Sequence, residues 1–128
     1  DIVEYLTTLD DIDINHNNIK GDTALMYAAY NGHINIVKHL YQQQKGVDIN
    51  HTSKTGYTAL IYAGYNGHIN IFKYLSMLDD IDITHTDNRG FTAAKHAAHN
   101  GHLNIAKYLL LLNDIDLDQY GDTALIFA

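Results

Sequence analysis

The stretch GDTALMYAAYNGH, residues 21–33, decides the fold, because the chain repeats it. It recurs as GYTALIYAGYNGH at residues 56–68 and as GFTAAKHAAHNGH at residues 90–102, and its beginning returns as GDTAL at 121–125. An aspartate followed by an aliphatic residue recurs in the same frame, at Asp13, Asp48, Asp82 and Asp116. These aspartates are 35, 34 and 34 residues apart, so the chain consists of similar units in tandem.

Each unit carries the signals of two short helices. A threonine precedes each alanine-rich segment and is expected to cap it, because its hydroxyl accepts an unpaired backbone N–H. These threonines are Thr23, Thr58, Thr92 and Thr123. Gly32, Gly67 and Gly101 are expected to end the first helices. A second helix follows, with apolar residues in helical spacing, and the polar stretch 48–56 is typical of a turn or hairpin.

The repeated threonine-alanine pair, the glycine-histidine pair and the aspartate signature together resemble the ankyrin repeat over essentially the whole chain. The resemblance implies an all-α solenoid of stacked ankyrin repeats, each with a hairpin loop and two helices. About three full repeats are expected, at 13–47, 48–81 and 82–115. Partial repeats are expected at both ends, with a second helix at 1–12 and the start of a repeat at 116–128.

Both ends place apolar residues where a neighbouring repeat would stack. We therefore expect further repeats to flank this segment in a longer protein, or the uncapped ends to self-associate. The last hairpin differs from the others, because the aspartate-to-glycine spacing is eight residues in three copies but five between Asp116 and Gly121. Either that hairpin is shorter or three residues are missing from it.

Composition narrows the function classes. A net charge of −7 with eight scattered Lys and Arg residues argues against a nucleic-acid partner and suits a neutral or basic protein. No apolar run is long enough to cross a bilayer, and cysteine is absent. We expect no membrane partner and an intracellular, cytoplasmic location.

The nine histidines suggest metal binding or catalysis, yet their places in the repeat favour structural roles. His33, His68 and His102 match the family's structural histidine and are expected to tie down the turn. His16, His51 and His85 share one hairpin position and are too far apart to share a metal ion. His96 and His99 lie one helical turn apart without a third ligand. We predict no metal, no cofactor and no enzymatic activity, and we assign the acidic pairs such as Asp79-Asp80 to solvated turns.

The resemblance implies a binding surface instead. Ankyrin repeats contact partners through hairpin tips and the exposed side of the first helix, on the concave face. The corresponding residues are Ile19, Lys20, Asp22, Tyr30, Asn31, Lys54, Thr55, Tyr57, Tyr65, Asn66, Asn88, Arg89, Phe91, His99 and Asn100. We predict a protein-protein interaction module; the alternative is a segment that positions a catalytic or membrane domain elsewhere in a longer chain.

Overall fold

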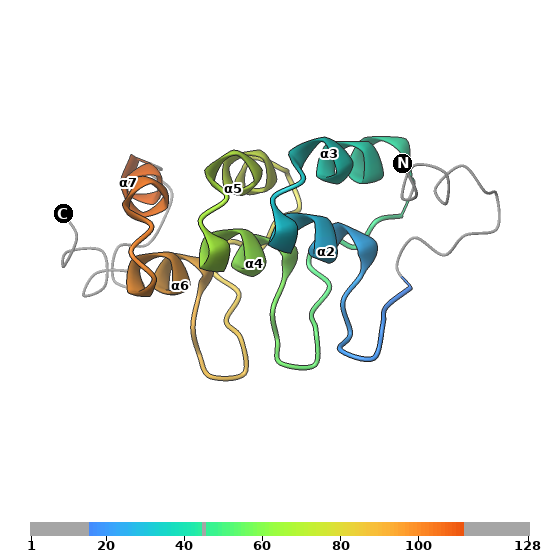
Figure 1. Cartoon of the computed structure of the whole chain (residues 1–128), viewed down its shortest axis with the longest axis horizontal. Helices are drawn as coiled ribbons and strands as arrows, with labels where there is room; N and C mark the ends of the chain where they lie inside the picture. The colour runs from blue at the N-terminus through green and yellow to red at the C-terminus, as the bar shows by residue number, and fades with distance from the viewer. Residues whose placement is uncertain (1–15, 45, 112–128) are drawn as a thin grey trace.

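The computed structural model describes residues 16–44 and 46–111, which form three helix pairs (Figure 1). The pairs are α2 (Ala24–Asn31) with α3 (Ile34–Gln43), α4 (Ala59–Asn66) with α5 (Ile69–Ser76), and α6 (Ala93–His99) with α7 (Leu103–Leu111). No β-strand occurs in these residues. The predicted all-α stack of helix pairs is confirmed.

Several predictions concern residues outside the described ranges. These are the helix at 1–12, the partial repeat at 116–128, the hairpin between Asp116 and Gly121, and the cap at Thr123. The division into repeat units, the flanking repeats and self-association through the ends stay predictions.

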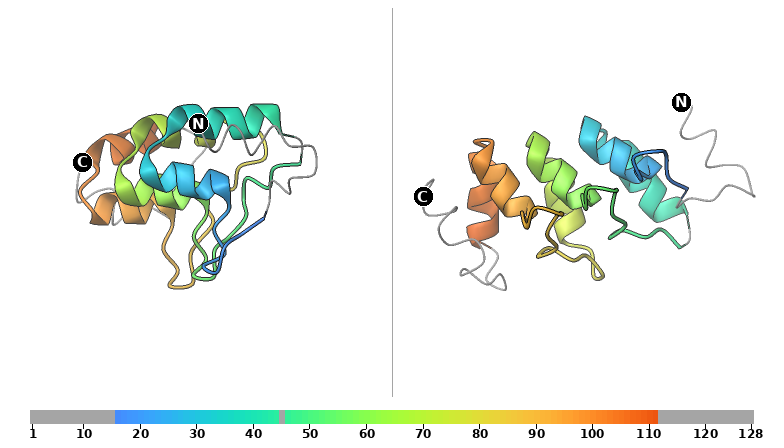
Figure 2. Two further views of the ribbon diagram at one scale, coloured as in Figure 1. Left: turned by 45° about the vertical axis from the view of Figure 1, so that its right-hand side comes forward. Right: turned by 90° about the horizontal axis from the view of Figure 1, so that it is seen from below.

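The helices form two layers. The first helices α2, α4 and α6 lie side by side in one layer, the second helices α3, α5 and α7 form the other, and each first helix packs on the second helix of its own pair. The hairpins project from the first-helix layer, away from the second helices (Figures 1 and 2). The first helices and the hairpins therefore form one continuous face.

The predicted caps position the first helices. The Oγ1 atoms of Thr23, Thr58 and Thr92 accept hydrogen bonds from the backbone N–H groups three residues later, at 3.3, 3.2 and 3.1 Å. Gly32 and Gly67 follow α2 and α4 with φ of 81° and 76°, the left-handed conformation that glycine adopts without strain. The sequence signals at both ends of α2 and α4 therefore act as predicted. Helix α6 differs at its end, because Asn100, with φ of −91°, caps it one residue before the predicted Gly101.

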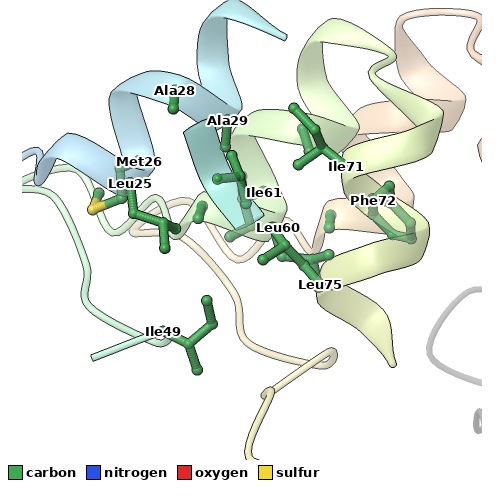
Figure 3. Close-up of a cluster of buried hydrophobic side chains, with 14 of the residues drawn as sticks. Leu25, Met26, Ala28, Ala29, Ile49, Leu60, Ile61, Ile71, Phe72 and Leu75 are labelled. Carbon is green, nitrogen blue, oxygen red and sulfur yellow. The ribbon is translucent and has the colours of Figure 1, made fainter. Parts of the chain in front are cut away.

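The core lies between the two layers and runs across the repeats (Figure 3). Phe72 and Leu75 of α5 are fully buried together with Leu60 of α4. Small residues allow the first helices to approach closely: a Cβ atom added at Gly64 would lie 2.8 Å from the carbonyl oxygen of Ala93. Tyrosines of the second helices, Tyr41, Tyr74 and Tyr108, also pack between repeats.

Histidine and asparagine side chains connect consecutive repeats. His68 Nε2 lies 2.9 Å from the carbonyl oxygen of Tyr30, which also accepts a hydrogen bond from the Asn66 amide at 2.8 Å. His102 and Asn100 make the same pair of contacts to the carbonyl oxygen of Tyr65. The prediction that the histidine ties down its own turn therefore needs correction, because the hydrogen bond crosses to the preceding repeat.

The hairpin histidines behave in the same way. His51 Nε2 lies 3.0 Å from the carbonyl oxygen of Gly21, and His85 Nε2 lies 3.1 Å from that of Gly56. Each imidazole is thus engaged with the backbone of the preceding hairpin.

Candidate functional site

The hairpin tips are held in register by backbone hydrogen bonds. Lys54 N–H donates to the carbonyl oxygen of Lys20, and Asn88 N–H donates to that of Thr55, both at 3.0 Å. The Asn88 side-chain amide adds a bond to the carbonyl oxygen of Lys54 at 2.9 Å. The tips of the three hairpins therefore lie side by side in a fixed arrangement, with their side chains along one edge of the molecule.

Above the tips, six rings form a continuous series across the three repeats, which we call the aromatic row. The row consists of Tyr30, Tyr62, Tyr57, Tyr65, His96 and Phe91. Centroids of neighbouring rings lie between 5.2 and 6.2 Å apart, in edge-on or tilted arrangements that aromatic pairs favour. Tyr30 and Tyr65 are its most open members, with 45% and 40% of their surfaces exposed.

Tyr62 fixes the row to the first hairpin. Its hydroxyl donates a hydrogen bond of 2.7 Å to Asp22 Oδ1 in the preceding repeat. Burial and this hydrogen bond, with the negative charge of Asp22, raise the pKa of the Tyr62 phenol far above its ordinary value. Tyr62 therefore stays protonated and keeps the Asp22 carboxylate engaged.

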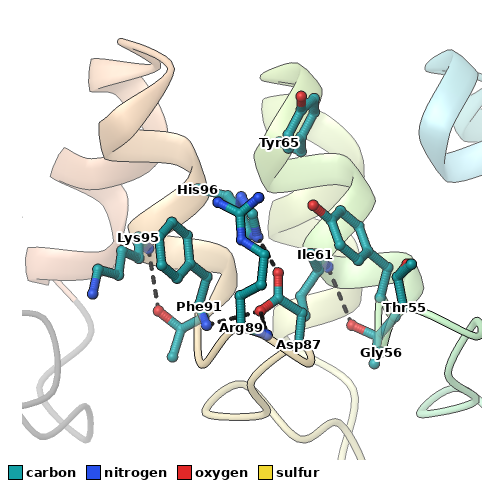
Figure 4. Close-up of polar contacts among 12 residues, drawn as sticks. Thr55, Gly56, Ile61, Tyr65, Asp87, Arg89, Phe91, Lys95 and His96 are labelled. Atoms are coloured by element: carbon teal, nitrogen blue, oxygen red, sulfur yellow. Dashed lines mark hydrogen bonds and ion pairs between the residues drawn. The ribbon is translucent and has the colours of Figure 1, made fainter.

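A buried aspartate holds the other end of the row (Figure 4). Asp87 Oδ2 lies 2.8 Å from His96 Nε2, and Asp87 Oδ1 accepts hydrogen bonds from the backbone N–H groups of Arg89 and Phe91, each at 2.9 Å. Burial tends to raise the pKa of Asp87, but the hydrogen bonds from Phe91, His96 and Arg89 outweigh it and lower that pKa. The carboxylate thus orders the hairpin and orients the His96 ring toward its aromatic neighbours.

Two cations flank the end of the row. The guanidinium carbon of Arg89 lies 4.9 Å from the Phe91 ring centroid, and Lys95 Nζ lies 4.7 Å from it. Figure 4 shows Phe91 between these two side chains. Cations at such distances are attracted to the negative face of the ring, so Phe91 favours the placement of both cations beside it.

The structure brings most of the sequence-predicted residues onto this one face. Tyr30, Tyr57, Tyr65 and Phe91 lie in the aromatic row, and Arg89 borders it. The tip residues Ile19, Lys20, Lys54 and Thr55 are exposed, as are Asn31 and His99. Asn66, Asn88 and Asn100 direct their amides to the preceding repeat, and Asp22 is engaged by Tyr62, so part of the set stabilises the stack.

Sequence reasoning missed Tyr62 and His96, the two residues that link the row. They occupy one position of the first helix, four residues after the capping threonine, where Tyr27 stands in the first repeat. A ring or imidazole at that position in all three full repeats is the signal that could have identified them.

We also searched the described part of the chain for a metal site and for a membrane-spanning helix. There, no three His, Asp, Glu or Cys side chains converge as a metal site would require. His96, one half of the histidine pair in α6, is 4% exposed and bonded to Asp87, while His99 is exposed. Each helix in this region is too short or too polar to cross a bilayer.

Comparison with known proteins agrees with the geometry. A family model of ankyrin repeats in three copies matches residues 1–87 and 76–128. A search of curated proteins finds no match to the chain. Since the two family matches together span all of its residues, the chain belongs to the ankyrin repeat family, whose repeats are in general protein-protein interaction modules and whose fold is typically non-catalytic.

Proposed function

We propose that this segment binds a partner protein through its hairpin and first-helix face, with the aromatic row at the centre of the interface. The observation that carries the proposal is the continuity of the row, because its rings touch from the first repeat to the third. A partner lying along it would contact all three repeats at once.

The chemistry of the face suits an interface. Tyrosine and arginine are enriched among residues that dominate binding energy, because they bury a large area with few rotatable bonds. Tyr30 and Tyr65 still expose a large part of their rings. Hydrogen bonds to Asp22 and Asp87 hold the row in position, so a partner meets a surface that is already ordered.

The test is a double substitution of the two most exposed rings of the aromatic row. Tyr30→Ala with Tyr65→Ala removes ring surface and leaves the backbone carbonyl groups that accept the inter-repeat hydrogen bonds. Proteins captured from an extract of the source organism by the natural chain would be identified by mass spectrometry. Their affinity would then be measured with purified components, and we expect a loss of about tenfold or more for the variant.

The matched control removes two exposed apolar side chains from the second-helix side. Met77→Ala with Leu110→Ala does so, since these residues are 74% and 38% exposed and stand outside the row. The control is expected to bind as the natural chain does. Equal affinity of all three proteins, with thermal unfolding unchanged, would remove the proposal.

A further inference from the structure

We propose that the segment of the partner that meets the third repeat is acidic, and that its carboxylates bind at Arg89 and Lys95. This inference rests on the proposed function and names the chemistry of the partner. It starts from a separation of charge that the net charge of the whole chain conceals.

Basic residues gather on the hairpin and first-helix segments, residues 16–31, 50–66 and 84–99. These segments, which begin after the aspartates at the hairpin bases (Asp13, Asp48 and Asp82), hold four Lys or Arg residues and two Asp. Apart from those three aspartates, the rest of the chain holds four basic and ten acidic residues. The four cations are Lys20, Lys54, Arg89 and Lys95, and all are exposed. An acidic chain therefore presents four exposed cations on the face where its aromatic row lies.

The two acids of this face do not neutralise those cations. Asp22 accepts a hydrogen bond from Tyr62, and Asp87 is buried and engaged by His96 and two backbone N–H groups. Among the described residues, the side chains of Arg89 and Lys95 form no ion pair, and both lie beside the uncharged ring of Phe91. Their charges lie beside the Phe91 ring and remain available to an incoming anion.

The arrangement favours a carboxylate-bearing peptide. A carboxylate bound to Arg89 or Lys95 gains a charge-assisted hydrogen bond. An adjacent apolar side chain of the same peptide would meet the aromatic row, because the row includes Phe91, the ring beside both cations. A polyphosphate partner is disfavoured, because nucleic-acid affinity comes from many phosphate contacts and this face offers four cations spread over three repeats. We therefore commit to an acidic segment of a protein.

The experiment begins with a random peptide display library selected on the natural chain at low ionic strength. We expect the recovered peptides to be enriched in Asp and Glu over the starting library. A purified acidic peptide from this set should bind the chain less tightly as salt is added, because its contacts with exposed cations are screened. A peptide set without acidic enrichment would overturn the inference.

Charge reversal then locates the site. Arg89→Glu with Lys95→Glu should weaken binding of the acidic peptide by about tenfold or more, since attraction becomes repulsion. Arg89→Gln with Lys95→Gln gives a milder test that adds no negative charge. A peptide whose Asp and Glu are replaced by Lys should bind the charge-reversed chain better than it binds the natural one.

The chain offers a close control. Lys38 and Lys73 lie on the second helices with their Nζ atoms 5.5 Å from the ring centroids of Tyr74 and Tyr108. Lys38→Glu with Lys73→Glu therefore makes the same change of net charge and also removes two cation-ring contacts. It should leave peptide affinity unchanged; an equal loss in both charge-reversed proteins would show a general charge effect and overturn the inference.

The outcomes separate this inference from the proposed function. Selected peptides whose affinity falls in the Tyr30→Ala, Tyr65→Ala variant, but which are not enriched in Asp and Glu, would support the proposed binding face and refute the acidic partner. Selected peptides that bind the Tyr30→Ala, Tyr65→Ala variant as tightly as the natural chain would refute the binding face itself. Tighter binding of a thymidine oligonucleotide than of any selected peptide, lost on reversal of Arg89 and Lys95, would replace the protein partner with a nucleic acid.

Discussion

The Nε2 atom of His96 lies 2.8 Å from Oδ2 of Asp87, and both side chains are almost completely buried. This contact joins helix α6 to the hairpin before it. The other oxygen of Asp87 accepts two backbone N–H groups of that hairpin. One carboxylate thus sets the shape of the tip and the orientation of a ring in the aromatic row.

Replacing Asp87 with Ala should therefore destabilise the chain strongly. The change leaves two backbone donors and a buried imidazole without their acceptor, which we expect to lower the free energy of unfolding by about 2–4 kcal/mol. Asp87→Asn keeps one oxygen for the two N–H groups and offers an amide to His96. We therefore expect it to lower the free energy of unfolding by less than half as much as Asp87→Ala does. Urea denaturation followed by circular dichroism measures both, and equal losses would contradict this view of the site.

The same carboxylate predicts a dependence on pH. The pKa of Asp87 is lower in the folded chain than in the unfolded one, so the unfolded chain takes up its proton first as the pH falls. Its contribution to stability is therefore present above the ordinary pKa of about 4 and is lost below it. Between about pH 5 and pH 3, the free energy of unfolding should fall more steeply in the natural chain than in Asp87→Asn. If the free energy of unfolding depended on pH in the same way in both proteins, Asp87 would not contribute to the pH dependence of stability.

Two glycines with the same backbone conformation should respond differently to alanine. Gly67 and Gly101 have φ of 76° and 79°, so Ala at either position incurs the cost of left-handed backbone, about 1–2 kcal/mol. A Cβ atom at Gly67 would also lie 2.5 Å from Nδ1 of His102, whereas one at Gly101 meets no atom of residues 16–44 or 46–111 within 4 Å.

We expect Gly67→Ala to reduce the free energy of unfolding by about 1–2 kcal/mol more than Gly101→Ala does, because the His102 ring must move. Chemical denaturation of the two single variants measures the difference. Adding His102→Ala to each should bring the two values together. A difference that survives the loss of the imidazole would have another origin.

The hydroxyl of Tyr62 should contribute more to stability than that of Tyr41. Tyr62 donates to Asp22 at 2.7 Å from a partly buried position, whereas Tyr41 donates to the exposed Asp80 at 3.3 Å. Tyr62→Phe should lower the free energy of unfolding by about 1–1.5 kcal/mol, and Tyr41→Phe by about 0.5 kcal/mol or less. Thermal or urea unfolding of both variants tests the order, and the reverse order would be a contradiction.

The fold could be predicted from the sequence because its signals are local and repeated. Thr58 and Gly67 bound α4 by contacts within a few residues, and the same pattern recurs in each unit. The burial of Phe72 follows from apolar spacing on the second helix. These features depend on short-range geometry, which one unit already contains.

The site could be predicted only in part. Tyr57 and Phe91 were identified from their repeat position, but the rings that join them were not. The burial of His96 comes partly from Tyr57 and Tyr65 of the preceding repeat, which are distant from it in sequence, and partly from Asp87 of its own hairpin. The basic character of the face was also hidden, because the scattered cations converge only when the repeats stack.

The hydrogen bonds between repeats bear on how such an array can change over evolutionary time. His68 and His102 contact a carbonyl oxygen of the preceding repeat, an atom that every amino acid supplies. A duplicated unit can therefore dock on its parent through these contacts without a compensating substitution. The hairpin-tip and aromatic-row residues of a new copy could then change while the hydrogen bonds between repeats are kept. This provides a simple route to arrays of different length and different binding specificity.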